Sequence, residues 1–193
     1  MGQGVNDMRA TGGTADPGLR LLEDQQGHVS GVAPDDPPRA LLVCFSHLRW
    51  GFVWQRPQHL LSRAACHYDV LFIEEPAFEP VVTDQLRVET VAPGITVAVP
   101  VLAQARAYAA DQVQARLVRE HLRSRGSPAR TFWYYTPAAV SFSADLPRDL
   151  TVYDNMDELS AFRGASPDLI AQEKDLFAQA DLVFTGGRSL YEV

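Results

Sequence analysis

The chain has 193 residues, of which 46% are hydrophobic and 21% are charged, so it can bury the core of a single domain. Its formal net charge of −7 argues against a general nucleic-acid binder, which needs a positive surface. Two cysteines make neither a disulfide framework nor a zinc cluster, and no apolar run is long enough to cross a bilayer, so we expect a cytoplasmic protein.

The first 39 residues differ in composition from the rest of the chain. They are rich in Gly, Pro, Asp and Gln and end in Asp35-Asp36-Pro37-Pro38, which predicts a disordered leader over residues 1–39. We expect the folded domain to occupy residues 40–193.

A buried strand, a polar loop and a helix are predicted next. Ala40–Phe45 is a short apolar run, typical of a parallel sheet covered on both faces. Residues 46–56 hold two tryptophans, two arginines, a histidine and a glutamine, which is more than a connection needs. Pro57 suits the first turn of a helix whose apolar face would carry Leu60, Leu61, Ala64, Ala65 and Tyr68. Ligands of open α/β sheets bind beyond the carboxyl ends of the strands, so this loop is the first candidate site.

The middle of the chain predicts a strand, a hairpin and a long helix. Residues 69–73 form the strand, which ends in Glu74-Glu75-Pro76. Residues 86–90 and 95–99 alternate in hydrophobicity around a Pro93-Gly94 turn, which indicates a β-hairpin. An apolar stripe then predicts a helix from Leu102 to Arg125, ended by Gly126.

The remaining segments continue the alternation of strands and helices. Strands are predicted over residues 131–135, 150–153 and 181–185. A short helix is predicted from Pro137 to Phe142, and a longer one from Pro167 to Ala180 with Ser166 as its N-cap. Such an order indicates an α/β fold with a doubly wound, mostly parallel sheet. Right-handed crossovers would bring the loops that follow the strands to one rim.

Four blocks of sequence carry a resemblance: SHLRWGFVWQRPQHLLSR, VLFIEEP, VYDNMDELSAF and ADLVFTGGRSLYE, in this order. Together they resemble the N-terminal half of bacterial family-4-like, or group 1-like, glycosyltransferases of the two-domain GT-B architecture. The resemblance implies that residues 40–193 form a Rossmann-like domain that receives the acceptor. It also implies that a second domain, absent from these residues, binds the nucleotide-sugar, so that this chain alone has little or no transferase activity.

The loop over residues 46–56 is the leading candidate for a substrate site. The resemblance implies that this loop faces the cleft between two domains. Arg49 and Arg56 could bind a phosphate or an acidic sugar, and Trp50 or Trp54 could stack on a sugar face. In the alternative interpretation, Trp50, Phe52 and Trp54 pack under the loop, and the arginines pair with Glu74 and Glu75. The candidate substrate-binding residues are Ser46, His47, Arg49, Trp50, Gln55, Arg56, Glu74 and Glu75.

Acidic residues follow two of the predicted strands. Asp154, Asp157 and Glu158 could hold acceptor hydroxyls or accept a proton, which makes them the candidate catalytic residues. The alternative is helix capping, with Asp154 or Asn155 as the N-cap. The pair Glu74-Glu75 could orient the arginines or bind hydroxyls, and its alternative is an exposed acidic turn.

A glycine pair follows the last predicted strand. The N–H groups of Gly186, Gly187 and Arg188 could receive a phosphate at the start of a helix. The full dinucleotide fingerprint is missing, so a close turn is the alternative. The histidines have no spacing that suggests a metal site. We expect no metal and no cofactor, with a nucleotide-sugar as the donor substrate.

The main functional hypothesis is glycosyl transfer from a nucleotide-sugar to a cell-envelope polysaccharide or a lipid-linked acceptor. The expected partners are these two substrates and a separate donor-binding domain. A lipid-linked acceptor would also bring peripheral contact with the inner face of the plasma membrane. Two other classes stay open: a non-catalytic binding or interaction module, and a GT-B-shaped sugar-nucleotide epimerase.

Overall fold

The computed structural model describes residues 39–126, 129–157, 159 and 163–187, all of which belong to one compact unit, residues 38–193. The predicted leader therefore lies outside the described residues, apart from Arg39. The strands are β1 (Leu41–Ser46), β2 (Asp69–Glu74), β3 (Ala77–Glu79), β4 (Gln85–Ala92), β5 (Ile95–Ala103), β6 (Arg130–Tyr134), β7 (Leu150–Asn155) and β8 (Leu182–Thr185). The helices are α1 (Arg56–Ala64), α2 (Ala110–Arg125), α3 (Val140–Ser143) and α4 (Pro167–Gln179), with short 3₁₀ helices η2 (Gln104–Ala109) and η3 (Pro137–Ala139).

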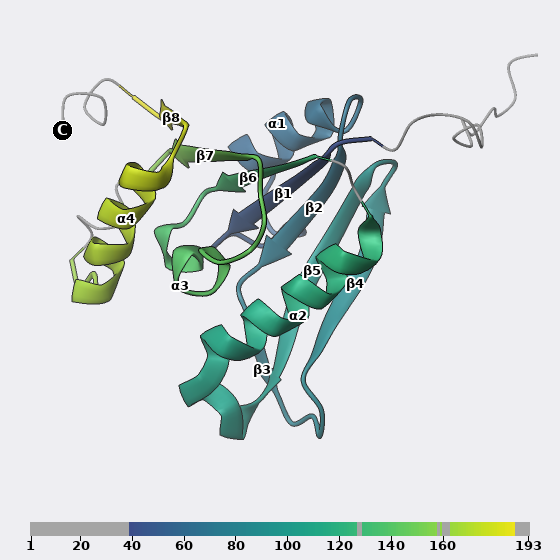
Figure 1. Cartoon of the computed structure of the whole chain (residues 1–193), viewed down its shortest axis with the longest axis vertical. Helices are drawn as coiled ribbons and strands as arrows, with labels where there is room; N and C mark the ends of the chain where they lie inside the picture. The colour runs from purple at the N-terminus through teal and green to yellow at the C-terminus, as the bar shows by residue number, and fades with distance from the viewer. Residues whose placement is uncertain (1–38, 127–128, 158, 160–162, 188–193) are drawn as a thin grey trace, which may run out of the picture. The chain divides into compact units, whose positions relative to one another are not determined.

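These elements form one eight-stranded sheet whose centre is β1 (Figure 1). The strand order is β3-β5-β2-β1-β6-β7-β8, with β4 paired to β5. Within the described residues only the β4–β5 pair is antiparallel. The chain builds outward from β1 through β2 and β5, then returns to the other side of β1 and continues through β6, β7 and β8. This arrangement confirms the predicted doubly wound, mostly parallel, Rossmann-like sheet.

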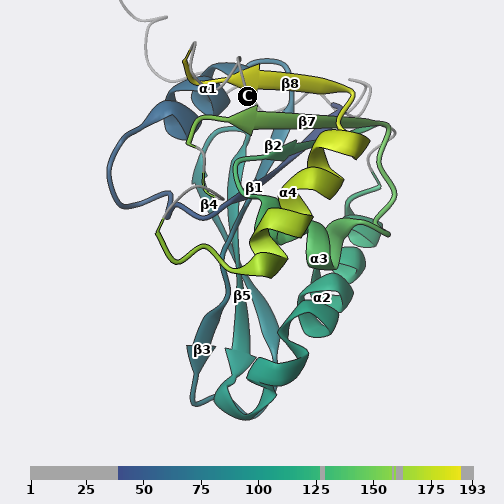
Figure 2. The same cartoon turned by 90° about the vertical axis from the view of Figure 1, so that its left-hand side faces the viewer.

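Helices cover both faces of the sheet (Figure 2). Successive side chains of β1 point to opposite faces of the sheet, as in any pleated strand. Leu41, Val43 and Phe45 pack in a cluster that includes residues of α2, α3 and α4. Leu42 and Cys44 belong to a second cluster, which includes Leu61 and Ala65 from α1 and the turn after it. We call these the α2 face and the α1 face.

The hairpin prediction is confirmed, because β4 and β5 pair antiparallel around a turn at Gly94. The predicted start of the long helix at Leu102 is wrong. Leu102 is fully buried in β5 and pairs with Phe78 of β3, a strand of three residues that the sequence did not reveal. A 3₁₀ helix then precedes α2, which begins at Ala110.

The predicted apolar face of the first helix is partly wrong. Leu61 and Ala65 are buried, but the side chains of Leu60 and Tyr68 are about one third exposed. The helix ends at Ala64, so Tyr68 lies beyond it, and the buried contacts come instead from Pro57, Gln58 and Leu61. In the described part of the chain, no helix has the length and apolarity needed to cross a membrane.

Candidate functional site at the carboxyl rim of the sheet

The residues that follow the central strands gather at the carboxyl edge of the sheet. The chain leaves β1 at Ser46 and β2 at Glu74, and β6 is followed directly by Tyr135 and Thr136. Because β1 lies between β2 and β6, the strand order reverses at this point. In open α/β sheets such a reversal leaves a crevice in which ligands bind. The leading candidate loop therefore lies where the fold itself favours a site.

The buried side chain of Gln58 organises this loop. Its carbonyl oxygen accepts from the Gln55 backbone N–H at 3.0 Å, and its amide nitrogen donates to the carbonyls of Trp50 at 3.0 Å and Val53 at 3.1 Å. Gln58 is fully buried. The bond to Gln55 is one half of a capping box at the start of α1. Gln58 is not among the predicted site residues, although its position three residues after the N-cap is the signal for this motif.

Arg49 and Glu74 form an ion pair beside the loop. Arg49 Nη1 lies 2.8 Å from Glu74 Oε2 and also donates to the Glu75 carbonyl at 2.8 Å. Glu74 Oε1 accepts from the Trp50 backbone N–H at 2.8 Å. Glu74 is buried and Glu75 is exposed, so the interpretation as an exposed acidic turn is wrong for Glu74. The side chain of Arg49 remains 43% exposed, so its outer edge faces solvent.

A second arginine is held by the carboxylate of Asp154. Arg56 Nε donates to Asp154 Oδ2 at 3.0 Å, and Nη2 lies 3.0 Å from Oδ1. Asp154 is fully buried inside β7, so it is no helix N-cap, and the capping interpretation is wrong for it and for the strand residue Asn155. The hydrogen bond to Asp154 raises the pKa of Arg56, whose side chain is 41% exposed. The guanidinium therefore stays charged and fixed at the rim.

Two neutral acids lie close to Asp154 on the α1 face. Burial raises the pKa of the Tyr135 phenol, and a negative charge on Cys44 or Asp154 acts in the same direction. Burial also raises the pKa of the Cys44 thiol, with the Asp154 charge as the second cause. Both groups therefore keep their protons at neutral pH, and Asp154 carries the negative charge of this cluster. Tyr135 is buried directly after β6, and its hydroxyl has no hydrogen-bond partner among the described residues.

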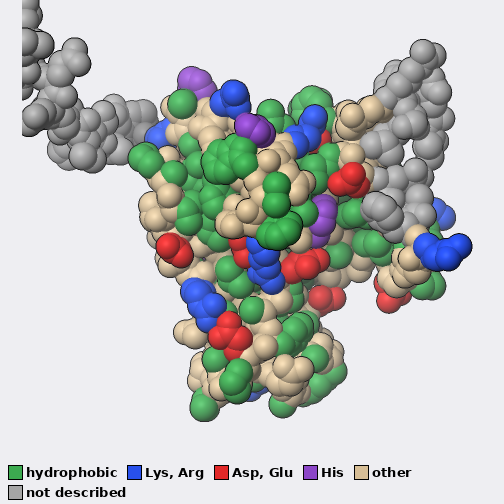
Figure 3. Space-filling view, turned by 180° about the vertical axis from the view of Figure 1, so that it is seen from behind, with side chains coloured by type: hydrophobic (Ala, Val, Ile, Leu, Met, Phe, Trp, Pro, Cys, Tyr) green, Lys and Arg blue, Asp and Glu red, His purple; other side chains and the backbone are tan. Residues whose placement is uncertain are grey.

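The aromatic residues of the loop divide into packed and exposed rings. Trp50 packs against Phe72 of β2, with ring centroids 5.1 Å apart, and against Trp54 at 6.0 Å. Trp54 is 56% exposed and Phe52 is 77% exposed. Figure 3 shows hydrophobic side chains gathered on this side of the molecule. The packing interpretation holds for Trp50, whereas Trp54 presents a ring to solvent.

Several other predicted residues lie near these pairs. Ser46 is buried, and its hydroxyl accepts from the Leu48 N–H at 3.0 Å. His47 is partly buried, and its Nδ1 has no hydrogen-bond partner among the described residues. Gln55 is half-buried at the N-cap of α1. Asp157 is exposed on the bend after β7. In the part of the chain that the structure describes, no group of His, Cys, Asp and Glu is arranged to hold a metal ion.

The glycine pair after β8 forms a close turn. The Gly186 N–H donates to the Asn155 carbonyl at 2.8 Å, and a Cβ at this position would lie 2.7 Å from the Met156 carbonyl oxygen. A Cβ at Gly187 would meet open space. The other two predicted site residues, Glu158 and Arg188, lie outside the described residues.

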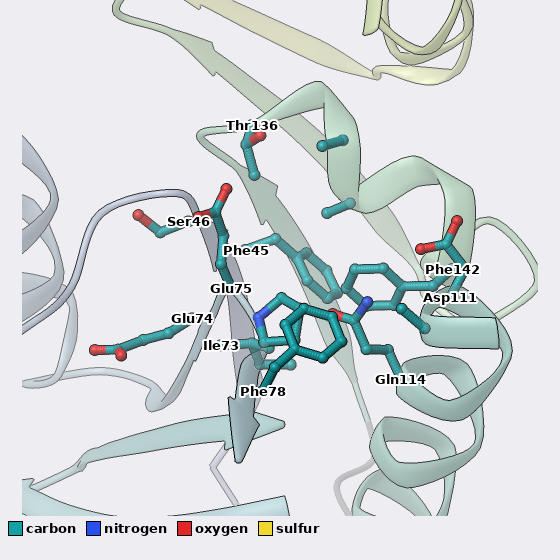
Figure 4. Close-up of a pocket in the computed structure, with 14 residues that line it drawn as sticks. Phe45, Ser46, Ile73, Glu74, Glu75, Phe78, Asp111, Gln114, Thr136 and Phe142 are labelled. Atoms are coloured by element: carbon teal, nitrogen blue, oxygen red, sulfur yellow. The ribbon is translucent and has the colours of Figure 1, made fainter. Parts of the chain in front are cut away.

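On the α2 face of the same rim there is an open pocket of about 350 Å³ (Figure 4). Its apolar surface comes mainly from Phe45, Ile73, Phe78 and Phe142, and Gln114 and Asp111 reach it from α2. Its polar lining also includes Ser46, Glu75 and Thr136. Glu74 lines this pocket as well, but Figure 4 shows its carboxylate pointing away from the pocket. This carboxylate forms the ion pair with Arg49. Three of the lining residues are not among the predicted site residues, because they belong to no sequence motif: Asp111, Gln114 and Thr136.

Comparisons with known proteins give the fold of this chain. No family model and no curated protein matches it. Among solved structures it is similar to the trehalose-6-phosphate protein from E. coli bound with UDP-2-fluoro glucose, with 13% identity and a TM-score of 0.53. It is also similar to sucrose-phosphate synthase from Thermosynechococcus elongatus, with 11% identity and a TM-score of 0.53. A UDP-forming trehalose-phosphate synthase from Burkholderia xenovorans in complex with glucose-6-phosphate has 10% identity and a TM-score of 0.51.

These matches cover 79%, 75% and 79% of this chain but only 41%, 42% and 41% of the solved ones. The chain thus spans about two fifths of the length of these neighbours. The neighbours are GT-B glycosyltransferases, so the shared fold agrees with the resemblance drawn from the sequence at this coarse level.

Proposed function

We propose that this chain is the acceptor-side part of a GT-B-type glycosyltransferase, which transfers a sugar from a nucleotide-sugar to a saccharide or lipid-linked acceptor of the cell envelope. The observation that carries the proposal is the pair of anchored arginines at the strand-order reversal. Arg49 and Arg56 are each held by a buried carboxylate and each keep more than two fifths of the side chain exposed.

Two fixed guanidinium groups can stabilise the negative charge that develops during glycosyl transfer. The leaving group of a nucleotide-sugar is a diphosphate, and its negative charge grows as the bond to the sugar breaks. Guanidinium groups fixed in advance stabilise such charge without a cost of reorganisation. In this scheme Glu74 and Asp154 act as positioning residues for the arginines. Asp154 is not available as a base, because its carboxylate is buried and already bound to Arg56.

The remaining rim residues fit the handling of an uncharged sugar. Trp54 offers an exposed ring for stacking, and Asp157 offers an exposed carboxylate for acceptor hydroxyls. Catalysis on this scheme depends on positioning and charge stabilisation and needs no covalent intermediate on the chain.

A titration of the purified chain, followed by backbone-amide NMR, tests the proposal. The ligands are neutral mono- and disaccharides and, separately, UDP-glucose. We expect the saccharides to shift amide signals of residues 46–56, 74–75 and 135–136. UDP-glucose should bind no more tightly than the saccharides and should not be hydrolysed. Tight binding of UDP-glucose with turnover would contradict an acceptor-side role, and so would the absence of any saccharide response.

A further inference from the structure

We propose that the pocket on the α2 face binds one neutral, hydroxyl-rich sugar ring and selects against phosphorylated or carboxylated sugars. The pocket itself is defined by its residues, and its assignment to the acceptor sugar rests on the proposed function. A volume of about 350 Å³ is at the low end for small-molecule sites, which run from about 300 to 1,000 Å³. It therefore suits a single ring better than a whole nucleotide-sugar.

Two polar side chains in the pocket lack a partner in the protein. Gln114 is 4% exposed and Thr136 is 5% exposed. Within the described residues, no group forms a hydrogen bond with the Gln114 amide or the Thr136 hydroxyl. Neither the Gln114 amide nor the Thr136 hydroxyl is fully enclosed by protein, so both polar groups remain accessible to a ligand. Both side chains line the same pocket (Figure 4), and an amide plus a hydroxyl are suitable partners for sugar hydroxyls.

Aromatic rings supply the apolar part of the pocket. Phe45 and Phe142 pack edge to face, with centroids 5.7 Å apart, and both line the pocket. A sugar ring has apolar C–H groups on its faces and hydroxyls around its edge. A pocket with an aromatic floor and polar groups at its sides matches both parts, as in ligand sites generally.

The charges around the pocket determine which sugars it accepts. Glu75 and Asp111 are exposed carboxylates in its lining, and no Lys, Arg or His lines it within the described residues. The N-terminus of α2 is a partial positive charge that would favour an anion. Asp111 lies in the first turn of this helix and already supplies a negative charge there. A phosphate would therefore meet two like charges and no neutralising side chain.

The test measures binding of three probes to the full chain by calorimetry: methyl α-glucoside, glucose 6-phosphate and glucosamine. We expect glucose 6-phosphate to bind at least fivefold more weakly than methyl α-glucoside, and glucosamine to bind at least as tightly. Gln114→Leu and Thr136→Val remove the hydrogen-bonding groups at nearly constant volume, and each should weaken methyl glucoside binding about tenfold. Glu75→Gln combined with Asp111→Asn should reduce the discrimination against glucose 6-phosphate without weakening the neutral sugar.

The control is Arg116→Ala, an exposed residue of α2 whose only ion pair among the described residues is with Glu120 on the same helix. It should bind all probes as the wild type does. Gln114→Leu should unfold at or above the wild-type temperature, because its amide has no partner to lose.

Three results would overturn the inference. If methyl glucoside binds with unchanged affinity to Gln114→Leu and Thr136→Val, the sugar lies elsewhere, and the proposed function stands without this pocket. If glucose 6-phosphate binds more tightly than methyl glucoside, the charge selection is wrong. If no sugar binds the folded wild type, both the pocket and the proposed function fail.

Discussion

The ion pair between Arg56 and Asp154 is asymmetric. Asp154 is fully buried, whereas the side chain of Arg56 is 41% exposed. A buried charge that loses its partner is far more costly than an exposed one. The two partners should therefore differ in what their removal does.

We expect Arg56→Ala to lower the free energy of unfolding by about 3 kcal/mol, because it leaves a buried carboxylate without a countercharge. Asp154→Asn should lower it by only about 1 kcal/mol, because the exposed guanidinium can turn to water. Urea denaturation measures both values, with Arg116→Ala as a control near zero. Equal losses for the two variants would show that the burial of Asp154 does not dominate this pair.

At the scale of single residues, the sequence predicted which side chains lie at the rim better than what they do there. Arg49, Arg56 and Asp154 were singled out because they follow strand ends. Their partners could not be predicted, because Arg56 and Asp154 are 98 residues apart in the chain. Gln114 and Thr136 belong to no motif, and only the folded structure shows that both residues line one pocket.

At the scale of elements, the loop after β1 depends on one helix residue. Gln58 makes three hydrogen bonds to the loop backbone and is fully buried. The loop is thus ordered before any ligand arrives, which lowers the entropy that binding must overcome.

Replacement of Gln58 by Leu should lower the free energy of unfolding by about 2 kcal/mol, since loop backbone groups lose their partners. The amide of Gln55 should exchange with deuterium at least tenfold faster, because its N–H no longer has an acceptor. Gln112→Leu, at an exposed position of α2, is the matched control. Unchanged protection of the Gln55 amide would mean that the loop is held by other contacts.

The hairpin of β4 and β5 turns at a glycine that has little tolerance for a side chain. Gly94 has a φ of +72°, and a Cβ there would lie 3.0 Å from the Ala65 carbonyl oxygen. Gly94→Ala should cost about 2 kcal/mol through the left-handed backbone and this close contact. Gly51→Ala, where a Cβ meets open space, should cost far less. Thermal unfolding of both variants decides the matter, and equal melting temperatures would refute the argument.

Most of the elements could be predicted because their signals are local. The hairpin has a Pro-Gly turn between alternating runs, and α4 has Ser166, whose side chain accepts from the Leu169 N–H at 3.1 Å. The three residues of β3 are too few for a periodic pattern. The start of α2 was misplaced because the apolar run of β5 continues to Leu102, and its strand character comes from pairing with β3.

At the scale of the whole molecule, buried acidic side chains make the folded state less stable at alkaline pH. Burial raises the pKa of Cys44, Tyr134 and Tyr135 in the folded chain. The folded state then keeps protons that the unfolded state loses above about pH 8.5 for Cys and about pH 10 for Tyr. The contribution of these groups to the free energy of unfolding is fully present below the pKa values that they have in the unfolded chain. It declines as the pH rises above those values.

We therefore expect the urea midpoint to hold steady from pH 7 to about pH 8.5 and to fall progressively towards pH 11. Tyr135→Phe should flatten this decline, and Cys44→Ala should delay its onset. Cys66→Ser changes an exposed cysteine and should leave the profile as it is in the wild type. A midpoint that is constant up to pH 11 would contradict the prediction.

The large sequence separation of Arg56 and Asp154 determines when their ion pair can form during synthesis of the chain. Ribosomes add about 5–20 residues per second, so Asp154 is synthesised about 5–20 seconds after Arg56. During that interval β1, α1 and β2 can already associate, because their contacts are close in sequence. The side chain of Arg56 has no Asp154 partner until β7 pairs with β6. The cationic edge of the rim is thus completed only after β7 has been made, when β1, α1, β2 and the hairpin of β4 and β5 are already synthesised.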